Sequence, residues 1–293
     1  MKIKIPKFSI VIPSYNRKNI LNNAICSVMK QTFLDWELWI IDDGSNDNTK
    51  DSLAGFLKDP RIHYKFQSNQ GVSAARNKGA ELATANWLVF LDSDDELLPN
   101  ALEKFYSEIL NQPKSQVFVA GFISKKSKED SGNEIIPKDG LFTAKLPGTF
   151  TLKKFLFLEI GAYDIRLKFS ENTELFHRIR VLGLNVINAP FPTMIYFDKL
   201  DGGSKNLRNM TDSLYIILDK HKSTLGNHVT TLYLQIIGVN HIRFGEYGFA
   251  KKVLWKAWLF APFKLGPLAR YFIACFPEIA KKFYPPLPKI WQA

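Results

Sequence analysis

Residues 87–95 read Trp87-Leu88-Val89-Phe90-Leu91-Asp92-Ser93-Asp94-Asp95, an apolar run that ends in three carboxylates within four positions. The run predicts a buried strand, and acids that end a strand lie at the carboxyl edge of a sheet, where open α/β folds bind ligands. Crowded carboxylates repel one another unless a cation neutralises them, and hard oxygen ligands suit Mg²⁺ or Mn²⁺, which in turn grip a diphosphate. An isolated Asp-X-Asp is also typical of an exposed turn or helix cap.

The chain before these acids alternates between strand-like and helix-like segments. Apolar strands are predicted at residues 8–13, 36–41 and 61–66, and helical patterns begin near residues 20, 47 and 72. Alternating strands and helices indicate a parallel sheet with right-handed crossovers. We therefore expect an α/β fold with a mostly parallel central sheet.

Polar residues follow successive predicted strands, namely Tyr15, Asp43 and then Asp92 with Asp94. No Gly-x-Gly-x-x-Gly follows the first strand and no Gly-Lys-Ser/Thr loop occurs, so the ordinary dinucleotide and phosphate-loop sites are disfavoured. An Asp such as Asp43 can accept the imide N–H of uracil while Tyr15 stacks on the base. The segment 42–45 is equally typical of a turn followed by a helix cap.

Five ordered segments within the first 95 residues resemble those of family 2 glycosyltransferases, which have the GT-A fold. These segments are Ser9–Arg17, Ser27–Phe33, Trp39–Ser45, Asn69–Asn77 and Leu91–Asp95, with weaker similarity in Ile160–Asp164 and Phe169–Leu175. The resemblance implies a GT-A domain, a Rossmann-like nucleotide-diphospho-sugar transferase fold, over residues 1–205. Within it, residues 1–100 would bind the nucleotide sugar and 101–205 would serve the acceptor and catalysis. A helical, basic and aromatic-rich extension is expected over 206–293.

The resemblance also implies which residues bind the donor, a sugar nucleotide of uridine. The nucleotide-binding set is Pro13, Tyr15, Asp43, Arg76, Asp92 and Ser93. Arg76 is expected beside the base or diphosphate, and Asp92 nearest the ribose and sugar.

A divalent cation, Mn²⁺ or Mg²⁺, is the cofactor that the resemblance implies. Asp94 would bind it between the two phosphates, with Asp95 assisting, so that the cation stabilises the charge on the leaving diphosphate. Relatives often carry an Arg and a His after the strand that ends near Tyr196, and this chain does not. Asp201 can instead supply an oxygen ligand and Lys199 can balance phosphate charge, although 202–203 is also typical of a flexible turn.

Inverting transfer needs a carboxylate that takes the proton of the acceptor hydroxyl. Relatives have a Glu-Asp pair before a hydrophobic helix, whereas this chain reads Glu171-Asn172-Thr173-Glu174. An amide has no proton-accepting state near pH 7, which excludes Asn172. We expect Glu171 to be the base. Glu174 or another acid is the alternative. If Glu174 is not the base, it would face solvent or cap the helix, since 170–174 also resembles a capping box.

Composition bounds the class of protein. The chain has 293 residues, 46% of them hydrophobic and 23% charged, as in a folded soluble protein. Its two distant cysteines, Cys26 and Cys275, suggest neither a disulfide framework nor a thiolate zinc site, and the five histidines show no metal-ligand spacing. The N-terminus lacks the pattern of a secretory signal. These features favour a cytoplasmic location.

The last part of the chain is basic. The formal net charge is +11, and from Arg243 onward nine Lys or Arg stand against two Glu. Helices are predicted within 206–242, and 249–261 is an amphipathic basic helix. Basic residues interleaved with aromatics are typical of an interfacial membrane anchor, and equally of a helical cap or a homodimer interface. No apolar run approaches the ~20 residues of a membrane span. Nucleic-acid binding is disfavoured because no known module is apparent.

The resemblance therefore implies an inverting glycosyltransferase of the hexosyltransferase type. Its donor would be a UDP-sugar and its acceptor a hydroxyl of a glycan or lipid-linked saccharide in bacterial surface polysaccharide synthesis, with the enzyme peripheral on the inner face of the cell membrane. The alternative is a nucleotide-sugar-binding protein with impaired catalysis, motivated by Asn172 and the missing His.

Overall fold

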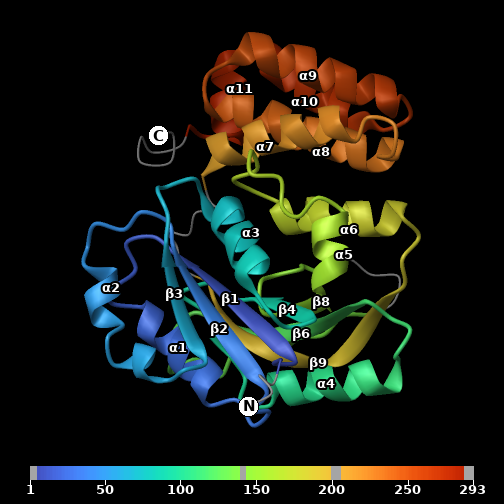
Figure 1. Cartoon of the computed structure of the whole chain (residues 1–293). Helices are drawn as coiled ribbons and strands as arrows, with labels where there is room; N and C mark the ends of the chain where they lie inside the picture. The colour runs from blue at the N-terminus through green and yellow to red at the C-terminus, as the bar shows by residue number, and fades with distance from the viewer. Residues whose placement is uncertain (1–4, 139–142, 199–205, 287–293) are drawn as a thin grey trace. The chain divides into compact units, whose positions relative to one another are not determined.

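The computed structural model describes residues 5–138, 143–198 and 206–286 (Figure 1). Contacts divide the chain into two compact units. The sheet unit comprises Met1–Ile165 and Glu171–Lys199, and the helical unit comprises Arg166–Ser170 and Leu200–Ala293.

The sheet unit begins with the parallel sheet that the sequence predicts. Its first four strands lie in the order β3-β2-β1-β4, and every neighbouring pair is parallel. They are β1 (Phe8–Ser14), β2 (Trp36–Asp42), β3 (Ile62–Phe66) and β4 (Trp87–Phe90). All residues of β1 and β4 are buried, which explains why these strands read as continuous apolar runs.

Beyond β4 the sheet becomes mixed. It continues in the order β4-β8-β6-β9-β5, with β8 antiparallel to both β4 and β6, β9 parallel to β6, and β5 antiparallel to β9. The strands are β5 (Glu96–Leu97), β6 (Val117–Lys125), β7 (Asn133–Ile135), β8 (Phe150–Lys153) and β9 (Val186–Phe197), and β7 pairs only with β6. The sheet thus joins a parallel half to a mixed half.

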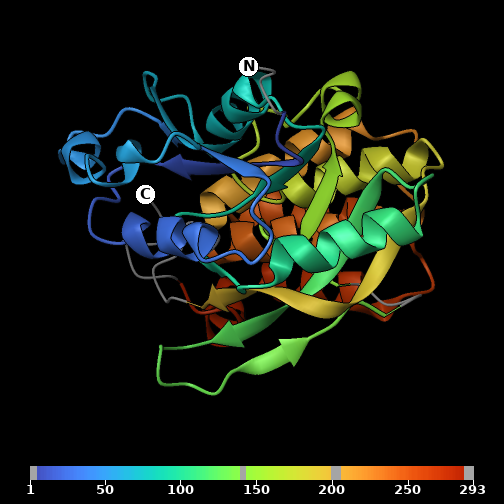
Figure 2. The ribbon, with the colours of Figure 1, turned by 60° about the horizontal axis from the view of Figure 1, so that its bottom comes forward.

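Helices cover both faces of this sheet (Figures 1 and 2). The longer ones are α1 (Leu21–Met29), α3 (Val72–Leu82), α4 (Ala101–Asn111), α5 (Lys154–Glu159) and α6 (Glu171–Val181), and α2 (Thr49–Ser52) and a 3-10 turn at Phe56–Lys58 are short. Alternate residues of β1 point to opposite faces: Ile10 and Ile12 join the core under α1 and α4, whereas Val11 joins the core under α3, α5 and α6.

Helix α3 packs closely on β1 because it carries Gly79 at the contact. A Cβ at this position would lie 2.3 Å from Val11 Cγ1, closer than real Cβ contacts. The close packing fixes α3, which begins at the carboxyl edge of the parallel strands, and so places the residues of its first two turns at that edge.

The helical unit consists of five helices in its described part. They are α7 (Leu207–Lys220), α8 (Asn227–Arg243), α9 (Tyr247–Phe260), α10 (Leu265–Cys275) and α11 (Pro277–Phe283). One small core lies between α7, α8 and α9, and a second joins α8, α9, α10 and α11. None of the helices in the described ranges is both long and apolar enough to cross a bilayer. The helices expected after residue 206 are thus present.

Candidate functional site

The carboxyl ends of β2, β1 and β4 lie side by side and gather the polar residues that follow each strand. Ser14 is paired with Asp42 at the ends of β1 and β2, and the Asp43 amide donates to the Ser14 carbonyl at 2.8 Å. Leu91 N donates to the carbonyl of Val11 in β1 at 3.0 Å, which holds the start of the acidic segment against the same strand.

The loops that follow β1 and β2 are tied together. Asn16 N donates to Ser45 Oγ at 2.8 Å, and Asn46 N donates back to Asn16 Oδ1 at 2.9 Å. Asn16 adopts the left-handed conformation, φ 53°, which Asn tolerates better than most residues. The adjacent Tyr15 side chain is about half exposed (48%), so its ring is accessible to a planar ligand, whereas Pro13 is buried within β1.

Asp43 holds the loop that leads into α3. Its Oδ1 accepts from Gln67 Nε2 at 2.8 Å and from the Gln70 amide at 2.9 Å, and its Oδ2 accepts from the Gly71 amide at 2.7 Å. A carboxylate offers about four acceptor positions, so Oδ2 retains one for a further donor. Gly44 is required beside it, because φ is +88° and a Cβ would lie 2.9 Å from the Asn69 amide nitrogen.

Asp42 forms the turn that the sequence offered as an alternative for 42–45. Its Oδ1 accepts from the Ser45 amide and its Oδ2 accepts from the Tyr64 hydroxyl, both at 2.8 Å. Burial, together with this hydrogen bond to Asp42, raises the pKa of Tyr64. The two neighbouring acids therefore have different tasks: Asp42 makes the turn, and Asp43 faces the loop before α3.

A buried arginine joins β4 to α6. Arg76, in the second turn of α3, is 2% exposed, and it donates from Nη2 to Asp92 Oδ1 at 2.5 Å and from Nη1 to Glu171 Oε1 at 2.9 Å. Its guanidinium carbon lies 5.5 Å from the centre of the Tyr163 ring, and its Nε has no hydrogen-bond partner in the described part of the chain. Both terminal nitrogens of Arg76 are thus engaged with carboxylates, and its expected position beside the base or diphosphate stays a prediction.

Charge and burial oppose each other at this bridge. Burial raises the pKa of the Asp92 carboxyl, the Arg76 cation works against that rise, and the nearby Asp94 charge adds to it. Burial disfavours the charge on Arg76, but Asp92 and Glu171 outweigh it and raise the pKa of the guanidinium. Arg76 therefore favours the ionised form of Asp92.

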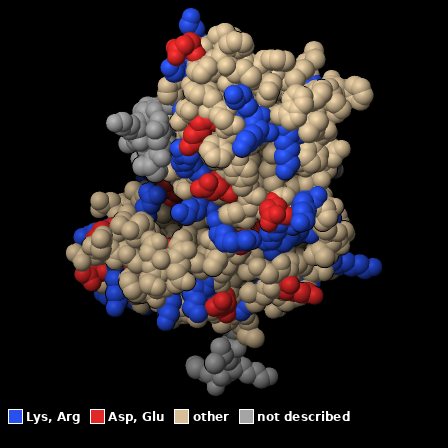
Figure 3. Space-filling model, turned by 90° about the horizontal axis from the view of Figure 1, so that it is seen from above, with Lys and Arg blue, Asp and Glu red and all other residues tan. Residues whose placement is uncertain are grey.

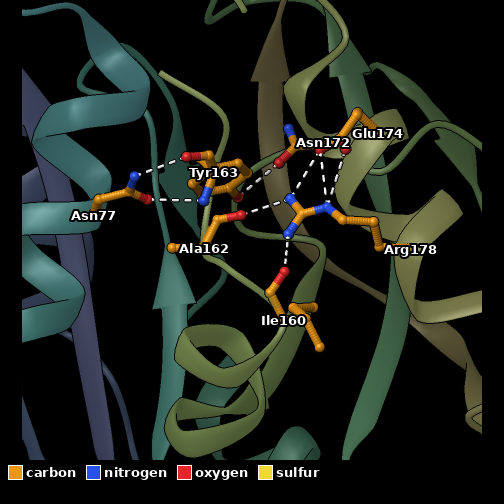
Figure 4. Close-up of polar contacts among 7 residues, drawn as sticks. All are labelled: Asn77, Ile160, Ala162, Tyr163, Asn172, Glu174 and Arg178. Carbon is orange, nitrogen blue, oxygen red and sulfur yellow. Dashed lines mark hydrogen bonds and ion pairs between the residues drawn. The ribbon is translucent and has the colours of Figure 1, made fainter. Parts of the chain in front are cut away.

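Asn172 has a defined structural role (Figure 4). Its Oδ1 accepts from the Tyr163 hydroxyl at 2.7 Å, and burial raises the Tyr163 pKa, so the hydroxyl remains a proton donor. Asn77 of α3 fixes the Tyr163 backbone by two hydrogen bonds of 2.8 and 2.9 Å. The amide of Asn172 thus links the start of α6 to α3 through Tyr163.

Glu174 faces the interior, and the expectation that it faces solvent or caps the helix was wrong. Its side chain is 0% exposed and pairs with Arg178, one turn later, at 2.8 Å (Figure 4). Arg178 also donates to the carbonyls of Ile160 and Ala162, both at 2.5 Å. A buried carboxylate is stabilised more by several hydrogen bonds from a guanidinium than by the N-terminus of a helix. Through Arg178, Glu174 therefore supports the segment that carries Tyr163.

The acidic segment alternates in exposure. Asp92 and Asp94 are half-buried, whereas Ser93 and Asp95 are buried. Asp95 Oδ1 accepts from the Phe197 amide at 3.1 Å, so this acid, expected to assist at the metal, holds the end of β9. Asp201 and Lys199 lie outside the described residues.

The carboxylate oxygens at this edge of the sheet are suitable ligands for a hard divalent cation. Within residues 5–138, 143–198 and 206–286 no group of three or more His, Cys, Asp or Glu is arranged to hold a metal ion. Mg²⁺ is, however, commonly bound by one or two carboxylates together with substrate phosphates, so half-buried Asp92 and Asp94 fit an ion that arrives with a diphosphate.

Comparison with known sequences finds a family and several relatives. A family model described as glycosyl transferase family 2 matches residues 9–166. The GalNAc(5)-diNAcBac-PP-undecaprenol beta-1,3-glucosyltransferase of Campylobacter jejuni is 38% identical over 158 residues, which cover 50% of each protein. The UDP-Glc:alpha-D-GlcNAc-diphosphoundecaprenol beta-1,3-glucosyltransferase WfgD of Escherichia coli is 41% identical over 105 residues, 35% of this chain and 40% of that one. The match spans half or less of the length of these relatives.

Comparison with solved structures supports the fold. The crystal structure of S. aureus TarS 1-349 covers 94% of this chain and 91% of its own, with a TM-score of 0.66 and 16% sequence identity. Its complex with UDP-GlcNAc gives a TM-score of 0.68 at 14% identity. The GT-A fold expected from the sequence is thereby confirmed.

Proposed function

This chain belongs to glycosyl transferase family 2, and on that premise we propose that it transfers a sugar from a nucleoside diphosphate sugar to an acceptor hydroxyl with inversion. The observation that carries the proposal is the double ion pair of Arg76 with Asp92 and Glu171. It holds the candidate donor-side acid, Asp92, and the candidate base, Glu171, on one guanidinium, although 95 residues separate Arg76 from Glu171.

Uridine is the nucleoside that the strand ends support best. Asp43 Oδ2 retains an acceptor position for the imide N–H of uracil, and the exposed ring of Tyr15 follows the adjacent strand. Two similar proteins carry the same donor class in their names: the E. coli relative uses UDP-Glc, and TarS was crystallised with UDP-GlcNAc. We therefore propose a UDP-sugar as donor, bound by the set Pro13, Tyr15, Asp43, Arg76, Asp92 and Ser93.

Asp94 is the proposed protein ligand of a divalent cation, with Asp201 as a second. When bound, Mn²⁺ or Mg²⁺ would supply positive charge beside the leaving diphosphate. Asp92 would face the ribose and sugar while Arg76 keeps it oriented and favours its ionised form.

Glu171 is the proposed catalytic base. It is the first residue of α6, its side chain is 15% exposed, and Arg76 occupies its Oε1. Its Oε2 makes no hydrogen bond within the described ranges, so this oxygen is the one that can take the acceptor proton. Asn172 and Glu174 are engaged with Tyr163 and Arg178, which supports Glu171 over Glu174.

A lipid-linked saccharide of a bacterial surface polysaccharide is the proposed acceptor. The names of the C. jejuni and E. coli relatives both state an undecaprenol-linked acceptor, which would place this chain in the cytoplasm beside the inner face of the membrane. The rival function, a nucleotide-sugar-binding protein without catalysis, is favoured by Asn172 and by the absence of the family's His.

Donor turnover separates the two functions. Purified chain incubated with a panel of nucleotide sugars and Mn²⁺ or Mg²⁺ is expected to release UDP slowly from one UDP-sugar, faster with acceptor, and not after chelation of the metal. Released nucleotide would be measured by chromatography. Tight UDP binding without release from any donor, with or without undecaprenol diphosphate-linked acceptor, would establish the binding protein instead.

Replacing Arg76 by Met should move the pH profile of transfer. Removing the Arg76 cation takes away the attraction that opposes burial, so the Asp92 pKa should rise further. A raised carboxyl pKa means that activity that depends on ionised Asp92 appears only at higher pH. The acid limb of kcat/KM against pH should therefore shift upward.

Arg76→Lys is the matched variant, because it retains the positive charge but lacks the two guanidinium nitrogens that reach both carboxylates. Its acid limb should stay close to that of the parent while kcat falls, since one ammonium does not orient two carboxylates as a guanidinium does. An unchanged acid limb in Arg76→Met would contradict this electrostatic role.

A further inference from the structure

Exposed apolar side chains concentrate in the last three helices. Of the 25 large apolar residues that are exposed in the described part of the chain, ten lie between residues 249 and 283. They are Phe249, Trp255, Leu259, Phe260, Phe263, Leu265, Phe272, Phe276, Ile279 and Phe283. Single exposed apolar residues are common on protein surfaces, but a concentration of this kind indicates an interaction surface.

Helix α9 separates its two faces clearly. Ala250, Val253, Leu254 and Ala257 are buried in the cores of the helical unit. The opposite face is exposed and reads Lys252, Trp255, Lys256 and Leu259, at positions i, i+3, i+4 and i+7. A tryptophan and a leucine therefore alternate with two cations on one outward stripe.

Helix α10 continues this stripe through aromatic contacts. The Trp255 ring lies 4.8 Å from that of Trp258 and 5.4 Å from that of Tyr271, measured between centroids, and Tyr271 lies 5.6 Å from Phe272. Trp255 and Phe272 are exposed, and the half-buried Trp258 and Tyr271 connect them, with Tyr271 packed on the core beneath. All four are amphipathic or apolar rings of the kind enriched at membrane interfaces.

Apolar residues in the turn between α9 and α10 and at the first position of α10 are still more exposed. Phe263 is 99% exposed and Leu265 is 77% exposed, with exposed Lys264 between them. Lys264 Nζ lies 2.9 Å from His228 Nδ1, at the start of α8, which ties the turn to the rest of the helical unit.

The surrounding charge is almost entirely positive. Residues 247–286 contain seven Lys or Arg and one acid, Glu278, which pairs with Lys281 at 2.7 Å. Figure 3 shows broad uncharged surface on which both basic and acidic side chains stand. Each cation near an anionic bilayer is attracted to the lipid phosphates, so this set favours an anionic surface over a neutral one.

We propose that the outward face of α9, α10 and their connecting turn, the aromatic-basic face, docks on the surface of an anionic phospholipid bilayer. The aromatics and Leu259 would enter the boundary between head groups and acyl chains while Lys252 and Lys256 meet lipid phosphates. The inference deepens the proposed function, and it rests on that function only for its purpose, which is to bring the enzyme to a lipid-linked acceptor.

Charge decides between a bilayer and a second copy of the chain. In a two-fold dimer through this face, the same cations would oppose one another, because such an interface pairs a patch with itself. Interface cores are also depleted in Lys, whereas a lysine beside a bilayer keeps its ammonium in water and its stem on the apolar surface. The observed mixture therefore fits a lipid surface better.

Flotation of the full chain tests the proposal without requiring catalysis. The chain should float with vesicles of phosphatidylcholine and phosphatidylglycerol, remain behind with phosphatidylcholine alone, and detach as salt rises. The double variants Phe263→Ser/Leu265→Ser and Lys252→Gln/Lys256→Gln should each reduce partitioning about tenfold, from lost apolar insertion and lost lipid attraction respectively.

Leu34→Ser is the matched control, since Leu34 is 69% exposed in the sheet unit, and it should float as the parent does. All variants should keep UDP binding, which separates failure of docking from failure of the proposed function. Equal flotation of every variant would overturn the proposal. So would absence of flotation combined with a dimer, in light scattering, that the Phe263→Ser/Leu265→Ser change dissociates.

Discussion

Transfer by the Glu171→Gln variant is expected to fall by roughly 10²–10⁴-fold in kcat, the usual contribution of a general base. Glutamine has nearly the shape of glutamate, and its carbonyl oxygen can still accept the hydrogen bond from Arg76 Nη1. The amide cannot take a proton from an acceptor hydroxyl near pH 7. UDP affinity, measured by calorimetry, should stay close to that of the parent because the donor contacts remain.

The matched control for this variant is Glu81→Gln. Glu81 lies on α3, its side chain is 58% exposed and its carboxylate pairs only with Lys78 among the described residues, so its replacement should leave transfer unchanged. Retained transfer in Glu171→Gln would exclude Glu171 as the base. Loss of both transfer and UDP affinity would show that Glu171 acts on the donor instead.

Replacing Glu174 by Gln should lower the free energy of unfolding by about 3–5 kcal/mol, the range for breaking a buried ion pair. The change leaves Arg178, whose side chain is 13% exposed, without its carboxylate. Arg178 also holds the carbonyls of Ile160 and Ala162, so the segment before Tyr163 should loosen as well. Chemical denaturation would measure the change.

A double variant that removes both charges, Glu174→Leu/Arg178→Met, provides the internal control. It should be more stable than Glu174→Gln, because no buried charge is left without a partner. A single variant as stable as the parent would contradict the structural role given to Glu174 and would return it to consideration as a base.

The parallel half of the fold could be predicted because its signals are local. β1 and β4 are buried on both faces, so they appear in sequence as unbroken apolar runs that end at polar residues. Neighbouring parallel strands then bring Tyr15, Asp43 and Asp92 to one edge. The amphipathic pattern after residue 249 likewise identified α9.

The mixed half could not be predicted in the same way. β9 contains Pro190 and Pro192, and a proline inside an apolar run argues against a strand. The structure accommodates them by an irregularity, where Gly121 of β6 pairs with Pro192 and the register shifts on both sides. β5 is only two residues long and carries no periodic pattern.

The local pattern of residues was sufficient to identify the family, the α/β alternation, the acidic edge and the basic aromatic helices, since each depends on neighbours in sequence. Folding alone brought Arg76 between Asp92 and Glu171, turned Glu174 inward to Arg178 and set Asn172 on the Tyr163 hydroxyl. The Arg76–Glu171 pair and the Asn77–Tyr163 contact that supports it join residues 95 and 86 positions apart, and no periodicity encodes such distances. The balance between burial and pairing of charge, which exists only in the packed chain, decides which acids support the fold and which remain available for chemistry.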